Sequence, residues 1–143
     1  MKTTILLYSL VFALGARTVF ADARVDAFLD RLAAVESNGD DAAVNEAGGA
    51  HGRYQITQPY LDDANAILGT AYTLTDMHDP AKARRVVCAY LAHYGARYVE
   101  ETGRACTAEV LVRIHNGGPR GWAKAATDHY AEKFAATEPQ EEN

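Results

Sequence analysis

Cysteine is scarce in this chain, as are clustered basic residues and long apolar runs. Two cysteines occur in 143 residues. A domain of about this length buries well over half of its unfolded surface, so its core need not depend on disulfide bonds. Beyond residue 21, no apolar stretch is long enough to cross a membrane. We therefore expect the remaining chain to be soluble, with no membrane partner.

The first 21 residues have the pattern of a secretory signal peptide. Lys2 precedes an apolar run from Ile5 to Ala16, and the small residues Val19 and Ala21 suit a signal-peptidase site. The run is too short to span a bilayer. We therefore expect residues 1–21 to be removed and the protein to be secreted, either to the outside or to a periplasm. An apolar core helix is the alternative.

The charge of the chain disfavours nucleic acid as a partner. The formal net charge is −5, and it becomes −7 without residues 1–21, because these hold Lys2 and Arg17 and no acid. Phosphate binding needs clustered Lys and Arg. A chain with this negative charge also lacks long-range attraction to an anionic bacterial wall. It would not be repelled by a neutral glycan such as chitin.

The two cysteines, Cys88 and Cys106, permit a disulfide in an oxidising compartment. If one straight helix runs from Cys88 to Thr102, its end lies about 21 Å from Cys88. The residues from there to Cys106 span at most about 14 Å. A bridge therefore requires a break near Gly95 or Gly103, and two buried thiols are the alternative.

Helical periods and capping residues predict one mainly α domain over residues 22–136. About five helices are expected: Asp22 to Glu36, the Thr57 cap to about Leu68, the central buried helix after Asp79-Pro80, the Thr107 cap to near His115, and about Thr127 to Ala136. Turns at residues 37–39 and 116–119 should end the helices before them. Residues 37–56 hold four glycines and no helical period, which predicts an irregular lobe or a small hairpin. Residues 137–143 should form a flexible acidic tail.

Glu36 is the candidate acid catalyst. It lies at the end of the first predicted helix, in phase with Leu32 and close to the apolar face. Removal from water and the negative end of a helix dipole both favour the protonated form of a carboxyl group. A protonated carboxyl can deliver a proton to the leaving oxygen of a glycosidic bond. Taken alone, a solvated glutamate at a helix end is the simpler interpretation.

Other catalytic and metal-binding signatures are missing from the sequence. No Gly-x-Ser-x-Gly elbow indicates a serine nucleophile, and no Asp-x-Asp-x-Asn-Gly ladder indicates an EF-hand. The five histidines are scattered and form no His-x-x-x-His pair. We therefore expect neither a metal site nor a cofactor.

The segments around Glu36 resemble the lysozyme-like superfamily, in particular soluble lytic transglycosylases and goose-type lysozymes. These segments are Glu36 to Asp40, Ala43 to Asn45, Gly48 to Gly52 and Tyr54 to Ile56. The likeness to invertebrate-type lysozymes is closer still. It is carried by Arg113 to Gly121, by Tyr54 to Ile56 with Pro59-Tyr60, and by Tyr130 to Phe134. The resemblance covers about residues 25–135 and implies a lysozyme-like fold.

The resemblance also implies roles for individual residues. Glu36 matches the acid catalyst. The residues expected to bind the sugar are Ser37 beside it, Tyr54 and Gln55 on the cleft floor, and His115 and Asn116 on the cleft wall. Amides donate and accept hydrogen bonds, as a hydroxyl-rich ligand requires. The alternatives are a helix-capping role for His115 and a core position for Tyr54.

The chain departs from the invertebrate-type pattern at the second acid. Those enzymes are rich in cysteine and use an aspartate before the Tyr-Gln-Ile segment. Asn45 stands at about that place here, and the adjacent Glu46 is the candidate second carboxylate, with Asp40 and Asp41 as alternatives. A single glutamate is the arrangement of lytic transglycosylases, in which a group of the substrate completes the reaction and a 1,6-anhydro product forms.

The resemblance implies a secreted glycoside hydrolase that cleaves β-1,4 bonds of peptidoglycan, or of a chitin-like glycan, with Glu36 as general acid. Two alternatives stay open: a lytic transglycosylase, and a non-catalytic glycan-binding protein on the same fold. An isopeptidase activity would need a nucleophile that the sequence does not identify. We expect a monomer.

Overall fold

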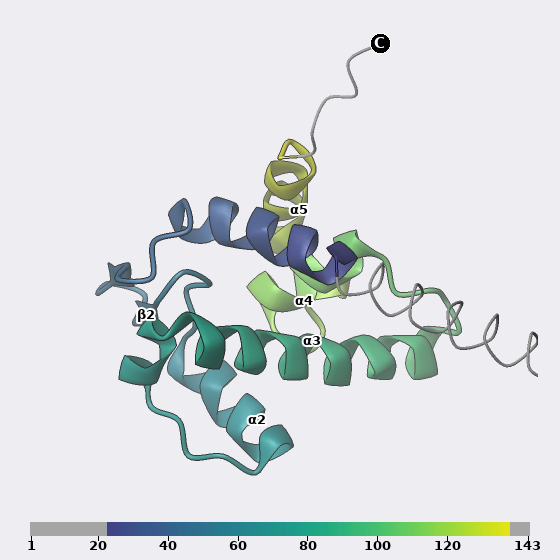
Figure 1. The fold of residues 1–143 in the computed structure, drawn as a ribbon. Helices are drawn as coiled ribbons and strands as arrows, with labels where there is room; N and C mark the ends of the chain where they lie inside the picture. The colour runs from purple at the N-terminus through teal and green to yellow at the C-terminus, as the bar shows by residue number, and fades with distance from the viewer. Residues whose placement is uncertain (1–22, 138–143) are drawn as a thin grey trace, which may run out of the picture. The chain divides into compact units, whose positions relative to one another are not determined.

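The described part of the chain runs from residue 23 to residue 137 in a computed structural model (Figure 1). The predicted signal peptide and residues 138–143 of the predicted tail lie outside it. The chain divides into two compact units, Met1–Asp30 and Arg31–Asn143. Residues 23–30 of the first unit are helical, and so are residues 31–37 of the second. All elements named below belong to the second unit.

The second unit is mainly α-helical and has one two-stranded hairpin. After residues 31–37 come the strands β1 (Val44–Asn45) and β2 (Ala50–His51), the helix α2 (Gln58–Leu68), the 3-10 helix η1 (Leu74–His78), the helices α3 (Pro80–Thr102) and α4 (Ala108–Gly117), the 3-10 helices η2 (Gly121–Ala123) and η3 (Ala125–Thr127), and the helix α5 (Asp128–Ala135). β1 and β2 pair antiparallel, with Val44 opposite His51. The predicted class, mainly α with about five helices and a small hairpin lobe, is confirmed.

α3 is the central helix, as its apolar pattern predicted. It packs against α2 and α4, and α4 packs in turn against α5 (Figure 1). The largest fully buried side chains of α2, α3 and α4 are Leu61, Val86, Val87, Tyr90, Val112 and Ile114. Burial of one such apolar side chain contributes about 1.5–3 kcal/mol. This shared core fixes α2 and α4, the helices that bring Tyr60 and His115 to the candidate site.

The helix of residues 31–37 ends at the predicted Ser37-Asn38-Gly39 turn. Asn38 and Gly39 adopt φ values of 55° and 77°. Their N–H groups donate to the carbonyl oxygens of Ala34 and Ala33 at 3.2 and 3.0 Å. This left-handed turn satisfies two of the last helical carbonyls and leads the chain into the hairpin lobe.

The predicted caps of α3 and α4 form, whereas that of α2 does not. Asp79 Oδ1 accepts hydrogen bonds from the backbone N–H groups two and three residues later, at 2.9 and 3.1 Å. Thr107 Oγ1 accepts one at 3.3 Å. Thr57 occupies the N-cap position of α2, but its side chain makes no capping hydrogen bond. Pro59 in the first turn still suits the helix start, because its φ is already helical.

α3 runs without a break past Gly95, so the break there that a disulfide could have used does not exist. Cys88 and Cys106 are both thiols. Gly95 is instead a point of close packing, where a Cβ atom would lie 3.1 Å from the Leu111 side chain and 3.2 Å from the Cys106 sulfur. Burial raises the pKa of the Cys106 thiol. Of the two alternatives left open by the sequence, the thiols are the one observed.

α4 ends two residues beyond the predicted end near His115, and the chain turns at Gly118. Gly118 has φ 85° and ψ −169°, a backbone conformation that favours glycine. Gly121 then lies so close to α4 that a Cβ atom would be 1.9 Å from the carbonyl oxygen of Arg113. This contact turns the chain back along α4, and α5 follows.

Candidate active site

Glu36 lies in the last turn of its helix, with 16% of its side chain exposed. The hydroxyl of Tyr130, from α5, donates a hydrogen bond to Glu36 Oε1. The Nε2 atom of His115, from α4, lies 3.3 Å from the same oxygen. Oε2 has no hydrogen-bond partner within residues 23–137. Because no buried polar side-chain atom of these residues lacks a partner, Oε2 is accessible to solvent.

His115 is buried, and both of its ring nitrogens are engaged. Nε2 lies 3.0 Å from the carbonyl oxygen of Tyr54, which only accepts, so Nε2 carries the hydrogen. Nδ1 lies 3.1 Å from the hydroxyl of Tyr60 and accepts its hydrogen bond. The imidazole therefore donates its N–H to the Tyr54 carbonyl, and Glu36 Oε1 lies 3.3 Å from the same nitrogen.

Burial keeps the phenols of this network neutral. It raises the pKa of Tyr60 well above its usual value. Burial is also the larger cause that raises the pKa of Tyr130, and the charge of Glu36 adds to it. A neutral phenol keeps its O–H, so Tyr60 donates to His115 and Tyr130 donates to Glu36 throughout the pH range in which proteins are folded.

The Ser37 hydroxyl connects the end of the Glu36 helix to the hairpin lobe. It donates to the carbonyl oxygen of Arg53 at 2.9 Å and accepts from the N–H of Asp40 at 3.0 Å. Arg53 Nε donates in turn to Asp41 Oδ1 at 2.6 Å, and this hydrogen bond raises the pKa of the guanidinium group. The position predicted to bind sugar thus holds the loop that follows the candidate acid.

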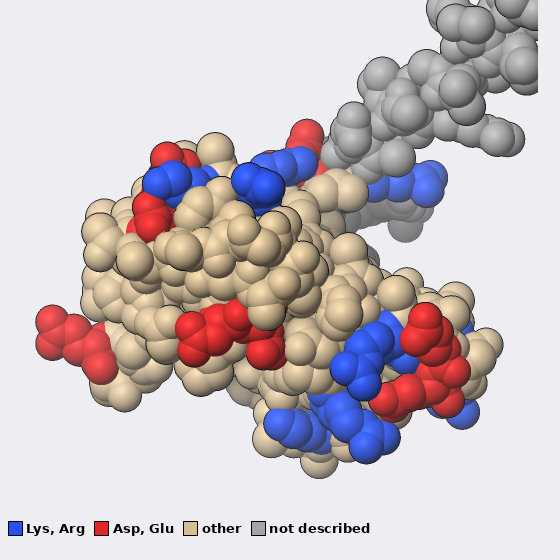
Figure 2. Space-filling model, turned by 90° about the horizontal axis from the view of Figure 1, so that it is seen from below, with Lys and Arg blue, Asp and Glu red and all other residues tan. Residues whose placement is uncertain are grey.

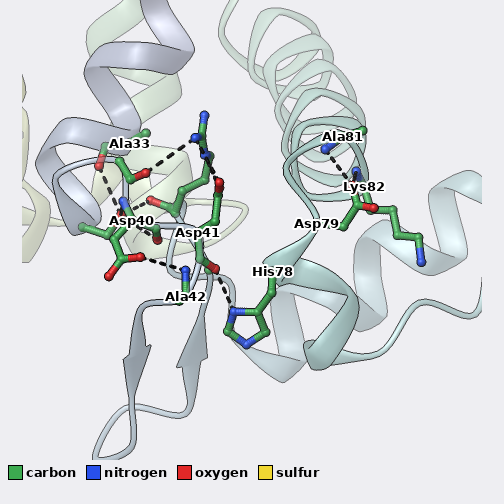
Figure 3. A network of polar contacts seen from close by, with 12 residues as sticks. Ala33, Asp40, Asp41, Ala42, His78, Asp79, Ala81 and Lys82 are labelled. Carbon is green, nitrogen blue, oxygen red and sulfur yellow. Dashed lines mark hydrogen bonds and ion pairs between the residues drawn. The ribbon is translucent and has the colours of Figure 1, made fainter.

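A pair of histidines, His51 and His78, connects the hairpin lobe to η1. Figure 3 shows the contact between His78 and Asp41. His78 Nδ1 lies 2.7 Å from the carbonyl oxygen of Asp41 and therefore carries the hydrogen. His78 Nε2 is then free to accept a hydrogen bond from His51 Nδ1, 3.3 Å away. Gly52 packs so closely against η1 that a Cβ atom would lie 2.1 Å from a backbone oxygen. These contacts hold β2, η1 and the loop of residues 38–43 together.

The other residues predicted to bind sugar differ in their accessibility. The Tyr54 ring is only 3% exposed, so its side chain occupies the core, and its carbonyl is what reaches His115. Gln55 is half-buried, has φ 51°, and donates from its amide to Gly52 at 2.9 Å. Asn116 is exposed on α4. Within the predicted set, Asn116 is therefore the exposed residue, Ser37 and Gln55 are half-buried, and Tyr54 and His115 are buried.

The candidate second carboxylates lie in the lobe. Glu46 is exposed in the turn between β1 and β2. Its neighbour Asn45 accepts the N–H of Gly48 at 3.1 Å and so shapes that turn. Asp41 is held by Arg53, and Asp40 accepts the N–H of residue 42 at 2.9 Å. Within residues 23–137, no three His, Cys, Asp or Glu side chains are grouped to hold a metal ion.

Tyr130 and Tyr60 are the site residues to which the sequence assigned no role. Both belong to segments that resemble invertebrate-type lysozymes, Tyr130 to Phe134 and Pro59-Tyr60, and this was the signal available. Neither residue is near Glu36 or His115 in sequence: the hydrogen bonds join residues 94 and 55 positions apart. They depend on how α2, α4 and α5 pack.

The sequence and the fold have counterparts among known proteins, although no family model matches the chain. The chain is 35% identical over 82 residues to a lysozyme of Magallana gigas, which is 57% of this chain and 56% of that protein. It is 34% identical over 85 residues to lysozyme 1 of Crassostrea virginica, which is 59% of this chain and 43% of that protein. The chain thus spans about half the length of these relatives.

A solved structure has the same fold. A chain in the crystal structure of Aeromonas hydrophila PliI in complex with Meretrix lusoria lysozyme superposes with a TM-score of 0.65 at 23% identity, over 77% of this chain and 87% of that chain. The protein is therefore lysozyme-like in fold and in sequence. This confirms the resemblance to the lysozyme-like superfamily that the motifs predicted.

Proposed function

We propose that this protein is a secreted glycoside hydrolase of the lysozyme type, which cleaves β-1,4 bonds of peptidoglycan with Glu36 as general acid. The observation that carries the proposal is the Glu36 carboxyl group itself. The Tyr130 hydroxyl donates to Oε1, the His115 Nε2 atom lies 3.3 Å from the same oxygen, and Oε2 is accessible to solvent. This arrangement leaves Oε2 as the oxygen from which a proton can pass to a substrate.

The reaction follows from this geometry. Oε2 transfers its proton to the glycosidic oxygen, and the bond between that oxygen and C1 breaks with its electron pair passing to the oxygen. The sugar then has the character of an oxocarbenium ion. A water molecule adds to C1, and its proton returns to the Glu36 carboxylate. Glu36 thus ends the cycle protonated, and one water has been consumed.

The sequence relatives and the surface charge support a glycan as substrate. Two relatives that match more than half of this chain are lysozymes. On the face that Figure 2 shows, Lys and Arg side chains lie beside Asp and Glu side chains. A surface of mixed charge neither attracts nor repels a long glycan strongly, since the opposite fields cancel within about 10 Å at moderate salt.

Secretion rests on the signal-peptide pattern of residues 1–21. N-terminal sequencing of the protein exported by a host cell tests it, with a new N-terminus at Asp22 as the expected result. Among residues 23–137, no helix is both long and apolar enough to cross a membrane.

A lytic transglycosylase is the second candidate, and the lobe favours it. Asn45 shapes the hairpin turn, and Glu46 is exposed in that turn. If neither acts with Glu36, the substrate's own 6-hydroxyl must capture C1. The product then carries a 1,6-anhydro ring and is one water lighter, which mass spectrometry of digested peptidoglycan detects.

Glu36→Gln tests the proposed function. The amide cannot supply the proton, so we expect glycan cleavage to fall at least about 100-fold, with unchanged thermal melting and unchanged glycan binding. Glu132→Gln is the matched control, because that side chain is exposed on α5. Cleavage by Glu36→Gln at the wild-type rate would exclude Glu36 as the acid. Binding without any cleavage by the wild-type protein would favour a non-catalytic glycan-binding protein.

A further inference from the structure

The two contacts made by the Glu36 carboxyl group converge on one of its oxygens. Tyr130 donates to Oε1, and the His115 Nε2 atom lies 3.3 Å from the same oxygen. We propose that Tyr130 is a positioning residue that reserves Oε1 as an acceptor, so that the transferable proton resides on Oε2, and that His115 packs beside that oxygen. This inference rests on the proposed function, because it names the residue that orients its acid.

Tyr130 is held rigidly enough to have this role. Arg113 of α4 donates to the buried Thr127 hydroxyl at 2.9 Å and to Asp128 Oδ1 at 2.5 Å, immediately before and at the start of α5. At the other end of α5, Arg31 donates to the carbonyl oxygen of Phe134 at 3.1 Å. Both ends of the short helix are therefore anchored, which fixes the position of the backbone that carries Tyr130.

His115 is fixed by a second, independent chain of contacts. Tyr60 donates to Nδ1, and the Tyr60 ring stacks on Tyr90 with centroids 3.6 Å apart and planes 16° from parallel. The other nitrogen is held by the Tyr54 carbonyl at 3.0 Å. The imidazole therefore keeps one tautomer and one orientation, with its N–H toward the Tyr54 carbonyl and its Nε2 atom 3.3 Å from Glu36 Oε1.

The Tyr130 donor suits the charge that develops during proton transfer. As the proton leaves Oε2, negative charge spreads over both carboxylate oxygens. A hydrogen bond to a charged acceptor is stronger than one to a neutral acceptor. The Tyr130 O–H is already aimed at Oε1, so it stabilises this charge without reorganisation.

Tyr130→Phe tests the inference because it removes one hydroxyl and keeps the ring. The groups that face the Glu36 carboxyl are Tyr130 from α5 and His115 from α4, with Tyr60 of α2 behind His115. Loss of the Tyr130 donor loosens the orientation of the carboxyl group. We expect kcat to fall about 10-fold with little change in KM.

Tyr94→Phe is the matched control. The Tyr94 hydroxyl also donates to a carboxylate, Asp63 Oδ2 at 2.9 Å, but on the α2–α3 side. A merely structural role for Tyr130 would lower the melting temperature and leave kcat unchanged below the melting transition, as we expect of Tyr94→Phe. The inference therefore requires that only Tyr130→Phe lowers kcat.

Two outcomes separate this inference from the proposed function. If Glu36→Gln is inactive while Tyr130→Phe has the kcat of wild type, the inference is wrong and the proposed function stands. If the wild-type protein cleaves no glycan, the NMR chemical shift of the ¹³C-labelled Glu36 carboxyl still tests the contact. Identical chemical shifts for wild type and Tyr130→Phe would overturn it, and a changed chemical shift in the variant would support it.

Discussion

The hydroxyl of Tyr130 donates a hydrogen bond to the carboxylate of Glu36, although 94 positions separate the two residues. Glu36 ends one helix and Tyr130 lies within another, α5, so the bond forms only once both have packed against α4. The candidate acid is thus oriented by tertiary structure. Its behaviour should respond to changes in the helices around it, as well as to changes in its own loop.

Tyr60→Phe should destabilise the fold through His115. The variant keeps the stacked ring but leaves the buried Nδ1 atom without its donor. An unsatisfied buried polar atom costs about 1–3 kcal/mol, so the free energy of unfolding in urea should fall by about that amount. Tyr72→Phe is the control, because the Tyr72 hydroxyl accepts from Arg85 at the surface. Its removal should lower the free energy of unfolding by well under 1 kcal/mol. Equal losses in both variants would contradict the role of Tyr60.

The fold was largely predictable because its helix boundaries depend on neighbouring residues. Asp79-Pro80 and Ser37-Asn38-Gly39 mark a start and an end in the sequence, and the structure places both there. Thr57 shows the limit of this reasoning. A threonine at an N-cap position can form a cap, but its rotamer depends on the packing around it, and here it makes no capping bond.

Asp79→Ala and Thr57→Ala should therefore differ in their effect on stability. Asp79 satisfies two backbone N–H groups of α3, and loss of such a cap costs about 0.5–2 kcal/mol. Thr57 satisfies none, so Thr57→Ala should change the free energy of unfolding by no more than a few tenths of a kcal/mol. Chemical denaturation of both variants measures the difference. A larger loss in Thr57→Ala would show that its cap forms in solution.

The candidate site was predictable only in part. Local signals located Glu36 at a helix end close to an apolar face, and its side chain is indeed mostly buried. Such local signals did not predict the direction in which the Tyr54 ring points. The turn of residues 52–55 is closed by reciprocal backbone hydrogen bonds between His51 and Ile56, and it directs the ring into the core. The contribution of Tyr130 required knowledge of how α5 packs.

Acid should weaken the link between η1 and α3. The hydrogen bond from Lys82, followed by those from Thr73, lowers the pKa of Asp76 to about 2. A carboxyl group with a lowered pKa in the folded state stabilises the fold above its unfolded value near 4, and this stabilisation is lost as the pH falls through about 2. Melting temperatures of wild type and Asp76→Asn should therefore differ at pH 6 and converge near pH 2.

Added salt provides a second test of the role assigned to Asp76. Lys82 and Asp76 are partly exposed, with 42% and 26% of their side chains accessible. Their attraction should be screened by added salt, whereas the Thr73 hydrogen bonds should persist. A difference between wild type and Asp76→Asn that stays constant from pH 6 to pH 2 would contradict the assigned cause.

Gly121→Ala should disturb the turn that carries the chain from α4 to α5. A Cβ atom at this position would lie 1.9 Å from the carbonyl oxygen of Arg113, so the backbone must move. Arg113 also holds Thr127 and Asp128, at the start of the helix that carries Tyr130. We expect the free energy of unfolding to fall by about 1–3 kcal/mol, and kcat on peptidoglycan to fall further than this instability explains. Ala123→Ser, exposed in the same 3-10 helix, is the control. If Gly121→Ala loses stability but keeps the kcat of wild type, the position of α5 does not govern the acid.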